Sequence, residues 1–223
     1  MLQVVRGDLY TAAVRGIMSE AVYTIGHSSR SVEELIGMLL EQGITTVADV
    51  RSQPYSRLHS QFNREAFSFD LGARGIGYVY LGAELGARSG DSSCYLNGKV
   101  QYPQLAKTAL FRQGLERIRA GMEKNLRISL LCAEKEPLAC HRSILISRHL
   151  VESGIVVRHI LDDKTVEEHS ATMQRLLFLL KMGGGNLFLS EAEILEEAYA
   201  IQGEKIAYDS RAKWDEDKEG LSA

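Results

Sequence analysis

The sequence lacks the features that mark several classes of protein. Among its 223 residues no apolar run approaches the roughly 20 residues of a membrane-spanning helix, so we expect no membrane segment. It has only three cysteines, an odd number with uneven spacing, which argues against a secreted scaffold held by disulfide bonds. The formal net charge of -3 provides no bulk attraction to nucleic acid or to a membrane surface.

Signals for export and for common cofactors are also missing. The first 20 positions read as no secretory leader, because they are interrupted by charged residues: Arg6, Asp8, Arg15 and Glu20. The chain has neither the glycine-rich fingerprint of a dinucleotide-binding domain nor a Walker phosphate loop. With 45% hydrophobic and 25% charged residues, the composition is that of an ordinary globular protein. We therefore expect a cytoplasmic protein, and the sequence names no cofactor.

Strand and helix patterns alternate along the middle of the chain. Short apolar runs predict five strands, at about 21–25, 44–50, 77–81, 127–131 and 155–161. Helical patterns lie between and after them, at about 31–43, 63–73, 104–122, 141–152 and 165–181. This alternation predicts an α/β fold with a mostly parallel sheet of about five strands, helices on both faces and right-handed crossovers.

The two ends of the chain differ from this alternating part. Residues 1–20 are predicted to be a flexible extension, and 21–182 a single α/β domain. Because Met18 directly precedes the first strand, residues 1–17 could lie upstream of the natural start. Residues 183–223 are predicted to form a C-terminal extension with a short helix and a charged tail.

Two further segments carry specific expectations. Within the C-terminal extension, three glycines at 183–185 predict a hinge and 191–199 a short acidic helix. The charged residues 204–220 are expected to be disordered or docked on a partner. The glycine-rich segment 82–103 is too long for a simple connection, so we interpret it as a lid or a binding loop.

Polar residues follow three of the predicted strands at the point where each strand ends. They lie at 26–30, at 49–52 and at 132–143. In an open parallel sheet the carboxyl ends of the strands meet at one edge, and ligands bind there. We therefore expect the three polar segments to contribute to one site.

Four ordered motifs also contain these residues. They are YTIGHS at 23–28, VADVRSQP at 47–54, GIGY with LGAELG at 75–86, and LCAE with CHR at 131–142. Together they resemble the bacterial and archaeal family called domain of unknown function 488, over roughly residues 21–180. The resemblance implies an α/β fold and supplies no established activity.

The last polar segment holds the strongest chemical signal. Cys132 closes a strand, and Cys140 lies at or just before the start of a helix, beside His141 and Arg142. A helix N-terminus and neighbouring cations lower the pKa of a thiol, so Cys140 is a candidate thiolate near neutral pH. Burial as small hydrophobic residues is the alternative for both cysteines.

The other polar side chains at this edge are assigned to proton transfer and to anion binding. Besides His141, the candidates for general acid or base are His27 and Asp49. Arg51 and Arg142 suit an oxyanion, because a guanidinium binds it in bidentate fashion. Further candidate contacts to the anion or substrate are Ser28, Arg30, Ser52, Glu134 and Ser143. A structural ion pair between Asp49 and Arg51 is the alternative.

Metal binding is not assigned to any residue. Seven residues separate Cys132 and Cys140, against two to four in a zinc knuckle, so the spacing disfavours a site made with His141 and His27. A reversible disulfide between the two cysteines fits the loop length. The remaining histidines have no clustering partner in the sequence and are interpreted as surface or internally satisfied residues: His59, His149, His159 and His169.

Three classes of function are compatible with these residues. The first is an enzyme, a hydrolase or transferase acting on an anionic small molecule or nucleotide, with nucleic acid as a further candidate because of the arginines at 51–88. A variant is thiol chemistry of the rhodanese or cysteine-phosphatase kind, although nine residues between Cys132 and Arg142 exceed the four or five in those loops. The second is a non-catalytic nucleotide- or nucleic-acid-binding or sensing module. The third is a structural metal site, which predicts stoichiometric zinc or iron in the purified protein. The oligomeric state is left open, with a homodimer as one possibility.

Overall fold

The structure is a computed structural model, and it describes residues 21–183 and 189–211. Its centre is a six-stranded sheet in the order β3-β2-β6-β1-β7-β8. The first five strands of this order are parallel, and β8 runs antiparallel to β7. In sheet order the strands are Gly77–Tyr80, Thr46–Asp49, Ile128–Cys132, Val22–Gly26, Val157–Ile160 and Val166–Glu168.

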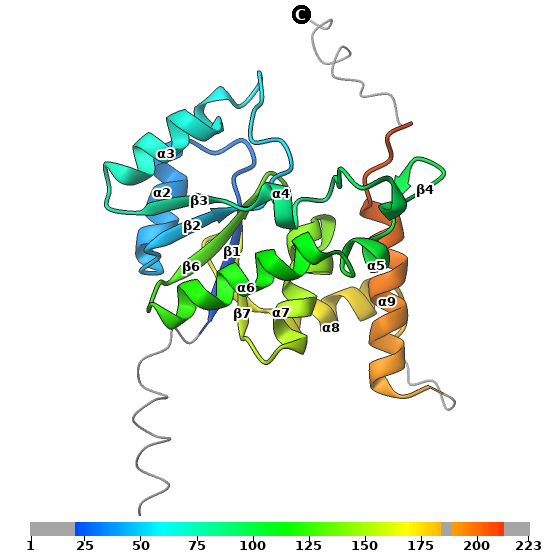
Figure 1. Cartoon of the computed structure of the whole chain (residues 1–223). Helices are drawn as coiled ribbons and strands as arrows, with labels where there is room; N and C mark the ends of the chain where they lie inside the picture. The colour runs from blue at the N-terminus through cyan, green and yellow to red at the C-terminus, as the bar shows by residue number, and fades with distance from the viewer. Residues whose placement is uncertain (1–20, 184–188, 212–223) are drawn as a thin grey trace, which may run out of the picture.

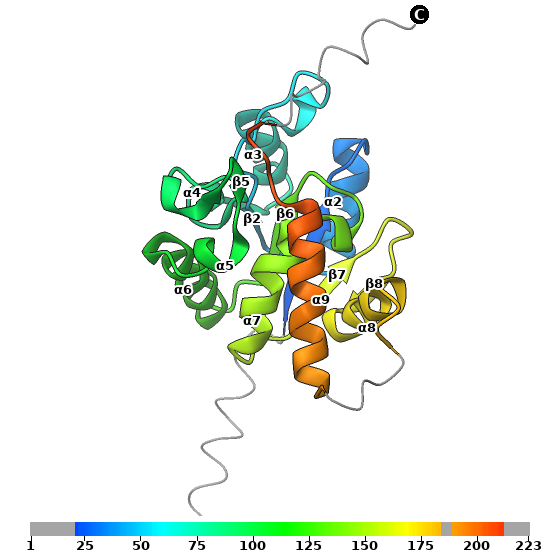
Figure 2. The same cartoon turned by 90° about the vertical axis from the view of Figure 1, so that its right-hand side faces the viewer.

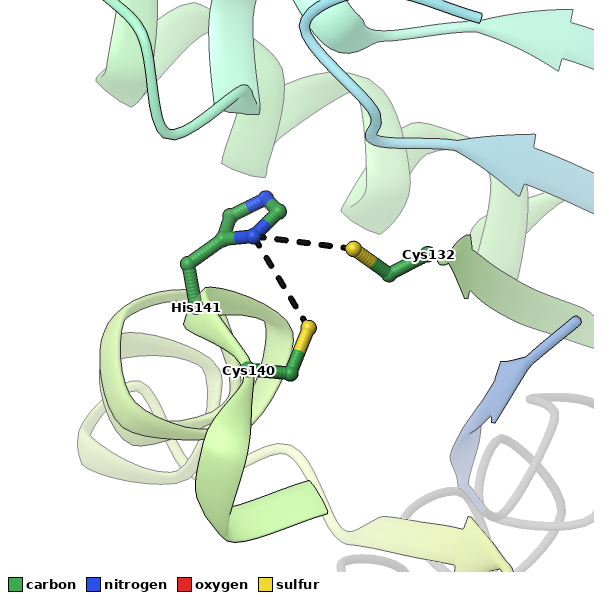
Figure 3. A group of neighbouring side chains, drawn as sticks. All are labelled: Cys132, Cys140 and His141. Atoms are coloured by element: carbon green, nitrogen blue, oxygen red, sulfur yellow. Dashed lines mark hydrogen bonds between the residues drawn. The ribbon is translucent and has the colours of Figure 1, made fainter. Parts of the chain in front are cut away.

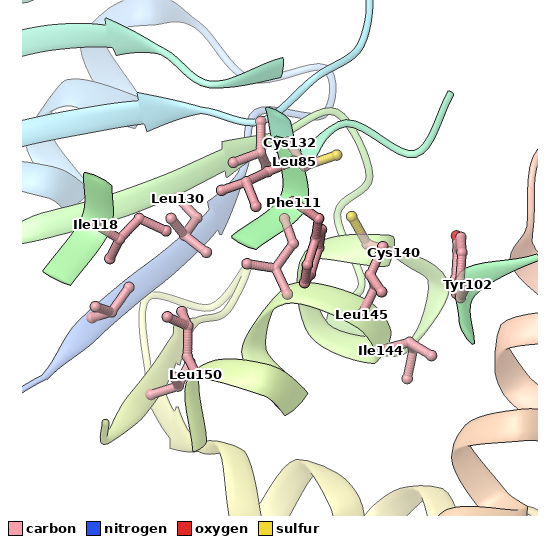
Figure 4. Close-up of a cluster of buried hydrophobic side chains, with 14 of the residues drawn as sticks. Leu85, Tyr102, Phe111, Ile118, Leu130, Cys132, Cys140, Ile144, Leu145 and Leu150 are labelled. Carbon is pink, nitrogen blue, oxygen red and sulfur yellow. The ribbon is translucent and has the colours of Figure 1, made fainter. Parts of the chain in front are cut away.

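Helices cover both faces of this sheet, as Figures 1 and 2 show. On one face lie α2 (Val32–Glu41) and α3 (Arg64–Gly72), packed on strand residues such as Tyr23, Val47 and Leu131. The opposite face carries α6 (Ala109–Glu123), the helix of residues 142–152, α8 (His169–Leu179) and α9 (Glu191–Ile206). Successive side chains of a strand point to opposite faces, so Val22, Ala48 and Leu130, the sequence neighbours of the residues just named, pack against this second group of helices. Figure 4 shows part of this second core.

The predicted fold class is therefore confirmed. Fully buried parallel strands read as short apolar runs because both of their faces are covered, and β1, β2 and β6 are buried throughout. The predicted start of α2 is also confirmed, since the Ser31 hydroxyl accepts a hydrogen bond from the Glu34 N–H at 3.1 Å. In the part of the chain that the structure describes, no helix is long and apolar enough to cross a membrane.

The helix predicted over 165–181 is wrong at its beginning. Residues 166–168 form the edge strand β8, and α8 begins only at His169. The reversal is made by a tight turn in which the Leu161 N–H donates to the Thr165 carbonyl at 2.9 Å. A strand of three residues is too short to show an alternating pattern, which is why the sequence did not reveal it.

The glycine-rich segment 82–103 contains regular structure of its own. It comprises α4 (Gly82–Leu85), a 3-10 turn, the hairpin of β4 (Tyr95–Leu96) and β5 (Lys99–Val100), and the start of α5 (Tyr102–Leu105). Asn97 and Gly98 both have positive φ, 49° and 81°, as the turn of a tight hairpin requires. The helix predicted over 104–122 is interrupted after α5, and Thr108 caps α6. The Asn-Gly pair was a usable hairpin signal that the sequence analysis missed.

The C-terminal helix is longer than expected and is part of the core. It begins with a capping box between Ser190 and Glu193 and continues to Ile206, instead of ending at residue 199. Its Ala198 and Tyr199 are buried in the second core. After it, residues 207–211 contact the hairpin, where the Val100 N–H donates to the Tyr208 carbonyl at 2.9 Å. The N-terminal extension, most of the glycine hinge and the tail beyond residue 211 lie outside the described residues.

Candidate functional site

The three polar segments meet, as predicted, at the carboxyl ends of the central strands. β6 lies between β2 and β1, and the chain leaves β2 toward one edge of the sheet and β6 toward the other. Such a change of direction is where open α/β sheets place their ligands. The segments are joined by backbone bonds, from the His27 N–H to the Cys132 carbonyl at 2.9 Å and from the Val50 N–H to the Leu131 carbonyl at 3.0 Å.

The side chains at this edge form two clusters, one on each face of the sheet. Asp49 aligns with Leu131, whereas Cys132 is one residue further along β6, so the two side chains point to opposite faces. We call the first the ion-pair cluster; its members are His27, Asp49, Arg51 and Tyr78. We call the second the sulfur cluster; its members are Cys132, Glu134, Cys140 and His141. The single converging site expected from the sequence is thus divided by the period-two alternation of strand side chains.

In the sulfur cluster, four potential ligand groups converge. The sulfurs of Cys132 and Cys140 lie 3.7 and 3.8 Å from Nδ1 of His141, as Figure 3 shows, and the three atoms lie within 4.8 Å of one another. A carboxylate oxygen of Glu134 lies 3.0 Å from the Cys132 sulfur and 3.4 Å from the Cys140 sulfur. Three members are buried, and Glu134 is exposed. Glu134 is thus the member of the cluster that lies at the protein surface.

The orientation of the His141 ring is fixed by the backbone. Its Nε2 lies 3.1 Å from the carbonyl oxygen of Val50, which follows β2. A carbonyl only accepts hydrogen bonds, so Nε2 carries the proton and Nδ1 of the neutral ring presents its lone pair to the two sulfurs. An imidazole held in this way by its second nitrogen is the usual arrangement of a metal-ligating histidine.

Charges around the cluster favour a thiolate at Cys140. Burial opposes ionisation, but hydrogen bonding by Cys132 and the positive charge of Arg142 outweigh it and hold the pKa of Cys140 well below its ordinary value. The backbone N–H of Arg142 also lies 3.5 Å from this sulfur. Although Glu134 as a residue is exposed, its carboxyl group faces the buried sulfurs, and this desolvation together with the neighbouring Cys140 raises its pKa. The cluster thus combines two sulfurs, of which that of Cys140 ionises more readily, with an imidazole and a carboxyl group.

Arg142 supports the loop above the sulfurs and is not free to bind an external anion. Its side chain is completely buried and donates to the carbonyls of Glu134 at 2.6 Å and Lys135 at 3.0 Å, and to the Thr24 hydroxyl at 3.3 Å. The same loop passes directly over Gly26, where a Cβ atom would lie 1.8 Å from the Glu134 carbonyl oxygen. The glycine of the first motif therefore lets the loop approach β1.

The ion-pair cluster satisfies its own charges. Arg51 donates to both carboxylate oxygens of Asp49, with Nε at 2.9 Å and Nη2 at 2.6 Å, and Nη2 also donates to the Phe62 carbonyl at 2.9 Å. The Tyr78 hydroxyl donates to Asp49 at 2.7 Å. The structural ion pair, which the sequence left open as an alternative to anion binding, is present.

His27 is held neutral within this cluster. Its Nδ1 donates to the Ser28 carbonyl at 2.8 Å, so Nε2 accepts from Arg51 at 3.3 Å. The ring stacks on Phe62 with 4.4 Å between centroids. Burial lowers the pKa of His27 to about 4. Both ring nitrogens are engaged, which leaves no nitrogen directed at a substrate.

The remaining predicted contact residues lie around the edge of the site. The Arg30 guanidinium donates to the Gly26 carbonyl at 2.6 Å and pairs with Asp162. Ser52 accepts a hydrogen bond from the Arg88 N–H at 2.9 Å. Ser28 has positive φ, 50°, as a turn residue does. Ser143 is buried, and its hydroxyl has no hydrogen-bond partner among the described residues.

His159 and His169 are internally satisfied, as expected, but the expectation that they have no clustering partner was wrong. His159 and His169 do have clustering partners, because Nε2 of His159 lies 2.9 Å from Nδ1 of His169. Thr24, at 2.7 Å from His159, and Tyr199, at 2.9 Å from His169, extend this contact. His159 and His169 are close in the chain, and the hairpin of β7 and β8 brings their rings together. No local signal connects them to Thr24 or to Tyr199, which are brought close by the pairing of β1 with β7 and by the packing of α9.

The comparison with protein families decides the classification. Residues 31–149, more than half of the chain, match the family described as domain of unknown function DUF488. The chain belongs to this family. The DUF488 match contains the polar segments at 49–52 and 132–143, whereas Gly26 and His27 precede it and α8 and α9 follow it. No curated protein and no solved structure matches the chain.

The separation of the cysteines along the chain does not argue against a metal in this DUF488 protein. Closely spaced cysteines are a feature of zinc knuckles, in which one tight turn supplies both ligands. Here Cys132 comes from the end of β6, and Cys140 and His141 come from the start of the following helix. The fold brings them together, and Cys132, Cys140 and His141 form a group that could hold a metal ion.

Proposed function

We propose that this protein is a metal-dependent enzyme of the hydrolase or transferase class, with a zinc-class ion held by Cys132, Cys140 and His141. One observation carries the proposal: three buried donor atoms lie within 4.8 Å of one another, and the Val50 carbonyl directs the lone pair of His141 toward the two sulfurs. Two sulfurs and an imidazole nitrogen are ligands that Zn²⁺ prefers. Three protein ligands leave one tetrahedral position for water or substrate.

Glu134 supports a catalytic role for the cluster over a purely structural one. It is the exposed member, and its carboxylate lies within 3.4 Å of both sulfurs. A bound zinc ion lowers the pKa of a water molecule, and a neighbouring carboxylate accepts the released proton. Glu134 is therefore proposed as the general base. Arg51 and Arg142 already donate hydrogen bonds to groups within the protein. For this reason neither is proposed to bind an anion.

A thiol enzyme is the second candidate, and one contact favours it. The Arg142 N–H points at the Cys140 sulfur from the start of a helix, which stabilises a thiolate nucleophile without any metal. The two candidates differ in what they expect of the purified protein. A metal site protects both sulfurs from alkylation, whereas a free thiolate reacts quickly near neutral pH.

Metal analysis of the full chain tests the proposal. The metal-free protein is titrated with Zn²⁺ and with Co²⁺, beside the variants Cys132→Ser, Cys140→Ser and His141→Ala. We expect about one equivalent of metal in the wild type and at least about tenfold weaker binding in each variant. Cys94→Ser is the matched control, because Cys94 is equally buried but lies outside the cluster, and it should bind like the wild type.

Two results would decide between the candidates. A wild-type protein that binds neither Zn²⁺ nor Co²⁺ more tightly than about 1 mM has no functional metal site. Rapid labelling of Cys140 by iodoacetamide at pH 7, with Cys94 unlabelled, would then support the thiol enzyme.

A further inference from the structure

A chain of buried hydrogen bonds runs from the candidate site to the C-terminal helix. Nε of Arg142 donates to the Thr24 hydroxyl at 3.3 Å, and that hydroxyl lies 2.7 Å from Nδ1 of His159. Nε2 of His159 lies 2.9 Å from Nδ1 of His169, whose Nε2 lies 2.9 Å from the Tyr199 hydroxyl. None of the five side chains is more than 6% exposed. We call these five residues the relay.

The direction of the bonds in the relay follows from the partners of Thr24. A guanidinium has no acceptor, so Arg142 must donate to Thr24. Among the described residues, Nδ1 of His159 is the one acceptor in hydrogen-bond contact with the Thr24 hydroxyl, so that hydroxyl donates to it and the proton of the ring lies on Nε2. Nε2 of His159 therefore donates to Nδ1 of His169, and Nε2 of His169 donates to Tyr199. Each ring is neutral, with its proton on Nε2.

The relay joins elements that the chain connects only indirectly. Thr24 lies on β1, His159 on β7, His169 at the start of α8 and Tyr199 in the middle of α9. Figure 2 shows α8 and α9 together beside β7. The last three residues follow the segment that matches the DUF488 family, while Arg142 lies inside it.

At its other end, Arg142 holds the loop that carries Glu134. Its two terminal nitrogens donate to the carbonyls of Glu134 and Lys135, so any rotation of the guanidinium moves that loop. The Glu134 carboxylate lies over the two sulfurs of the cluster. A displacement of Arg142 thus changes the position of the proposed general base.

We propose that Thr24, His159, His169 and Tyr199 are positioning residues, which orient Arg142 and so tie the docking of α9 to the geometry of the sulfur cluster. The effect on the cluster as a metal site rests on the proposed function, whereas the direction of the relay does not. The packing of α9 against the domain does not require the relay, because the helix already buries apolar side chains such as Ile194 and Ala198. A buried polar chain persists when each member satisfies the next.

The first experiment observes the protons of the relay directly. Long-range ¹H–¹⁵N NMR of the histidine rings distinguishes the two neutral tautomers. We expect Nε2–H in His159 and His169, and Nδ1–H in His27, which serves as the internal reference. A proton on Nδ1 of His159 would overturn the inferred direction, since Thr24 could not then donate to it.

The second experiment breaks the relay at each end in the full-length protein. Thr24→Val removes the hydroxyl but keeps the shape, and Thr24→Ser restores it. Tyr199→Phe removes only the terminal hydroxyl, while its ring remains under Arg148. Tyr208→Phe is the matched control, because Tyr208 also lies in the C-terminal part but outside the relay.

The readouts are Co²⁺ affinity and the absorption spectrum of bound Co²⁺. Because the Arg142 backbone N–H donates to the sulfur of the proposed ligand Cys140 at 3.5 Å, we expect Thr24→Val and Tyr199→Phe, which displace Arg142, to weaken Co²⁺ binding by up to about tenfold and to shift the spectrum. Thr24→Ser and Tyr208→Phe should resemble the wild type. If the wild type binds Co²⁺ and the two relay variants bind it equally with unchanged spectra, the positioning inference fails and the proposed function stands. If the wild type binds no metal, the proposed function fails, and the relay is tested by the tautomers and by whether Thr24→Val changes the alkylation rate of Cys140.

Discussion

The ion-pair cluster and the sulfur cluster occupy the same edge of the sheet and differ in how their polar groups are used. In the first, Arg51 is surrounded by the Asp49 carboxylate, the Phe62 carbonyl and Nε2 of His27, so every charge has an internal partner. In the second, two sulfurs and a ring nitrogen face one another, all within 4.8 Å. Polar residues at strand ends thus divide into those that stabilise the fold and those that we propose bind a ligand.

The largest expected difference between the clusters is in stability. Asp49→Ala leaves the Arg51 guanidinium, only 7% exposed, without its carboxylate. We expect the free energy of unfolding to fall by about 4 kcal/mol, because removing one partner of a buried ion pair leaves an uncompensated charge. Urea denaturation measures this, with the exposed Glu65→Ala as a control expected to change stability by less than about 0.5 kcal/mol. A loss below about 1 kcal/mol would show that the buried charge of Arg51 does not need the Asp49 carboxylate for its compensation.

A second comparison uses pH. The pKa of His27 is about 4 in the folded protein and 6.5 in its ordinary state, so the unfolded chain binds the proton more readily. The contribution of neutral His27 is therefore complete above about pH 6.5 and is lost as the pH falls from there toward 4, by about 3 kcal/mol in all. His27→Gln should flatten the pH dependence of the urea midpoint in this window. An unchanged slope in His27→Gln would contradict the buried neutral assignment.

Metal should stabilise one cluster only. Zn²⁺ at about 100 times its dissociation constant should raise the free energy of unfolding by about 2.7 kcal/mol, because it binds the folded state. Cys140→Ser should abolish this gain, whereas Cys94→Ser and Tyr78→Phe should retain it. Equal stabilisation of Cys140→Ser and the wild type would place the metal elsewhere in the protein.

The smallest expected effect concerns the outer partner of the ion pair. Tyr78→Phe removes one hydrogen bond to the Asp49 carboxylate and should lower the free energy of unfolding by about 1.5 kcal/mol. Tyr55→Phe, which removes an exposed hydrogen bond to Glu65, should cost less than about 0.5 kcal/mol. If urea denaturation shows that both substitutions lower the free energy of unfolding equally, then burial does not make the Tyr78 hydrogen bond more stabilising than the exposed one of Tyr55.

Much of the fold could be predicted from the sequence, because its determinants are local. The apolar runs of β1, β2 and β6, the Ser31 cap and the glycines after helices all act within a few residues. β8 escaped prediction because three residues show no periodicity, and α9 was cut short because its buried residues are separated by acidic ones. The hairpin at 95–100 could have been found from its Asn-Gly turn.

The candidate site was located by sequence but not resolved by it. Cys132, Cys140 and His141 were recognised as one group, since they flank a strand-to-helix crossing. That Asp49 and Cys132 face opposite sides was readable in principle from alternation along paired strands, but it depends on register, which pairing decides. Thr24 on β1 and Tyr199 on α9 lie far along the chain from His159 and His169, so no short window of sequence contains these partners.

By itself, then, the sequence determined the alternation of strands and helices and the residue types at the ends of the central strands. Hydrophobic periodicity, caps and glycine conformations are short-range properties that a chain carries before it folds. Tertiary structure decided which face of the sheet each polar side chain occupies. It also decided which arginines donate hydrogen bonds to carbonyls and carboxylates within the protein, and which ring nitrogen of each buried histidine carries the proton. These depend on hydrogen-bond partners supplied by distant segments, and only the packed sheet and its helices bring those segments within bonding distance.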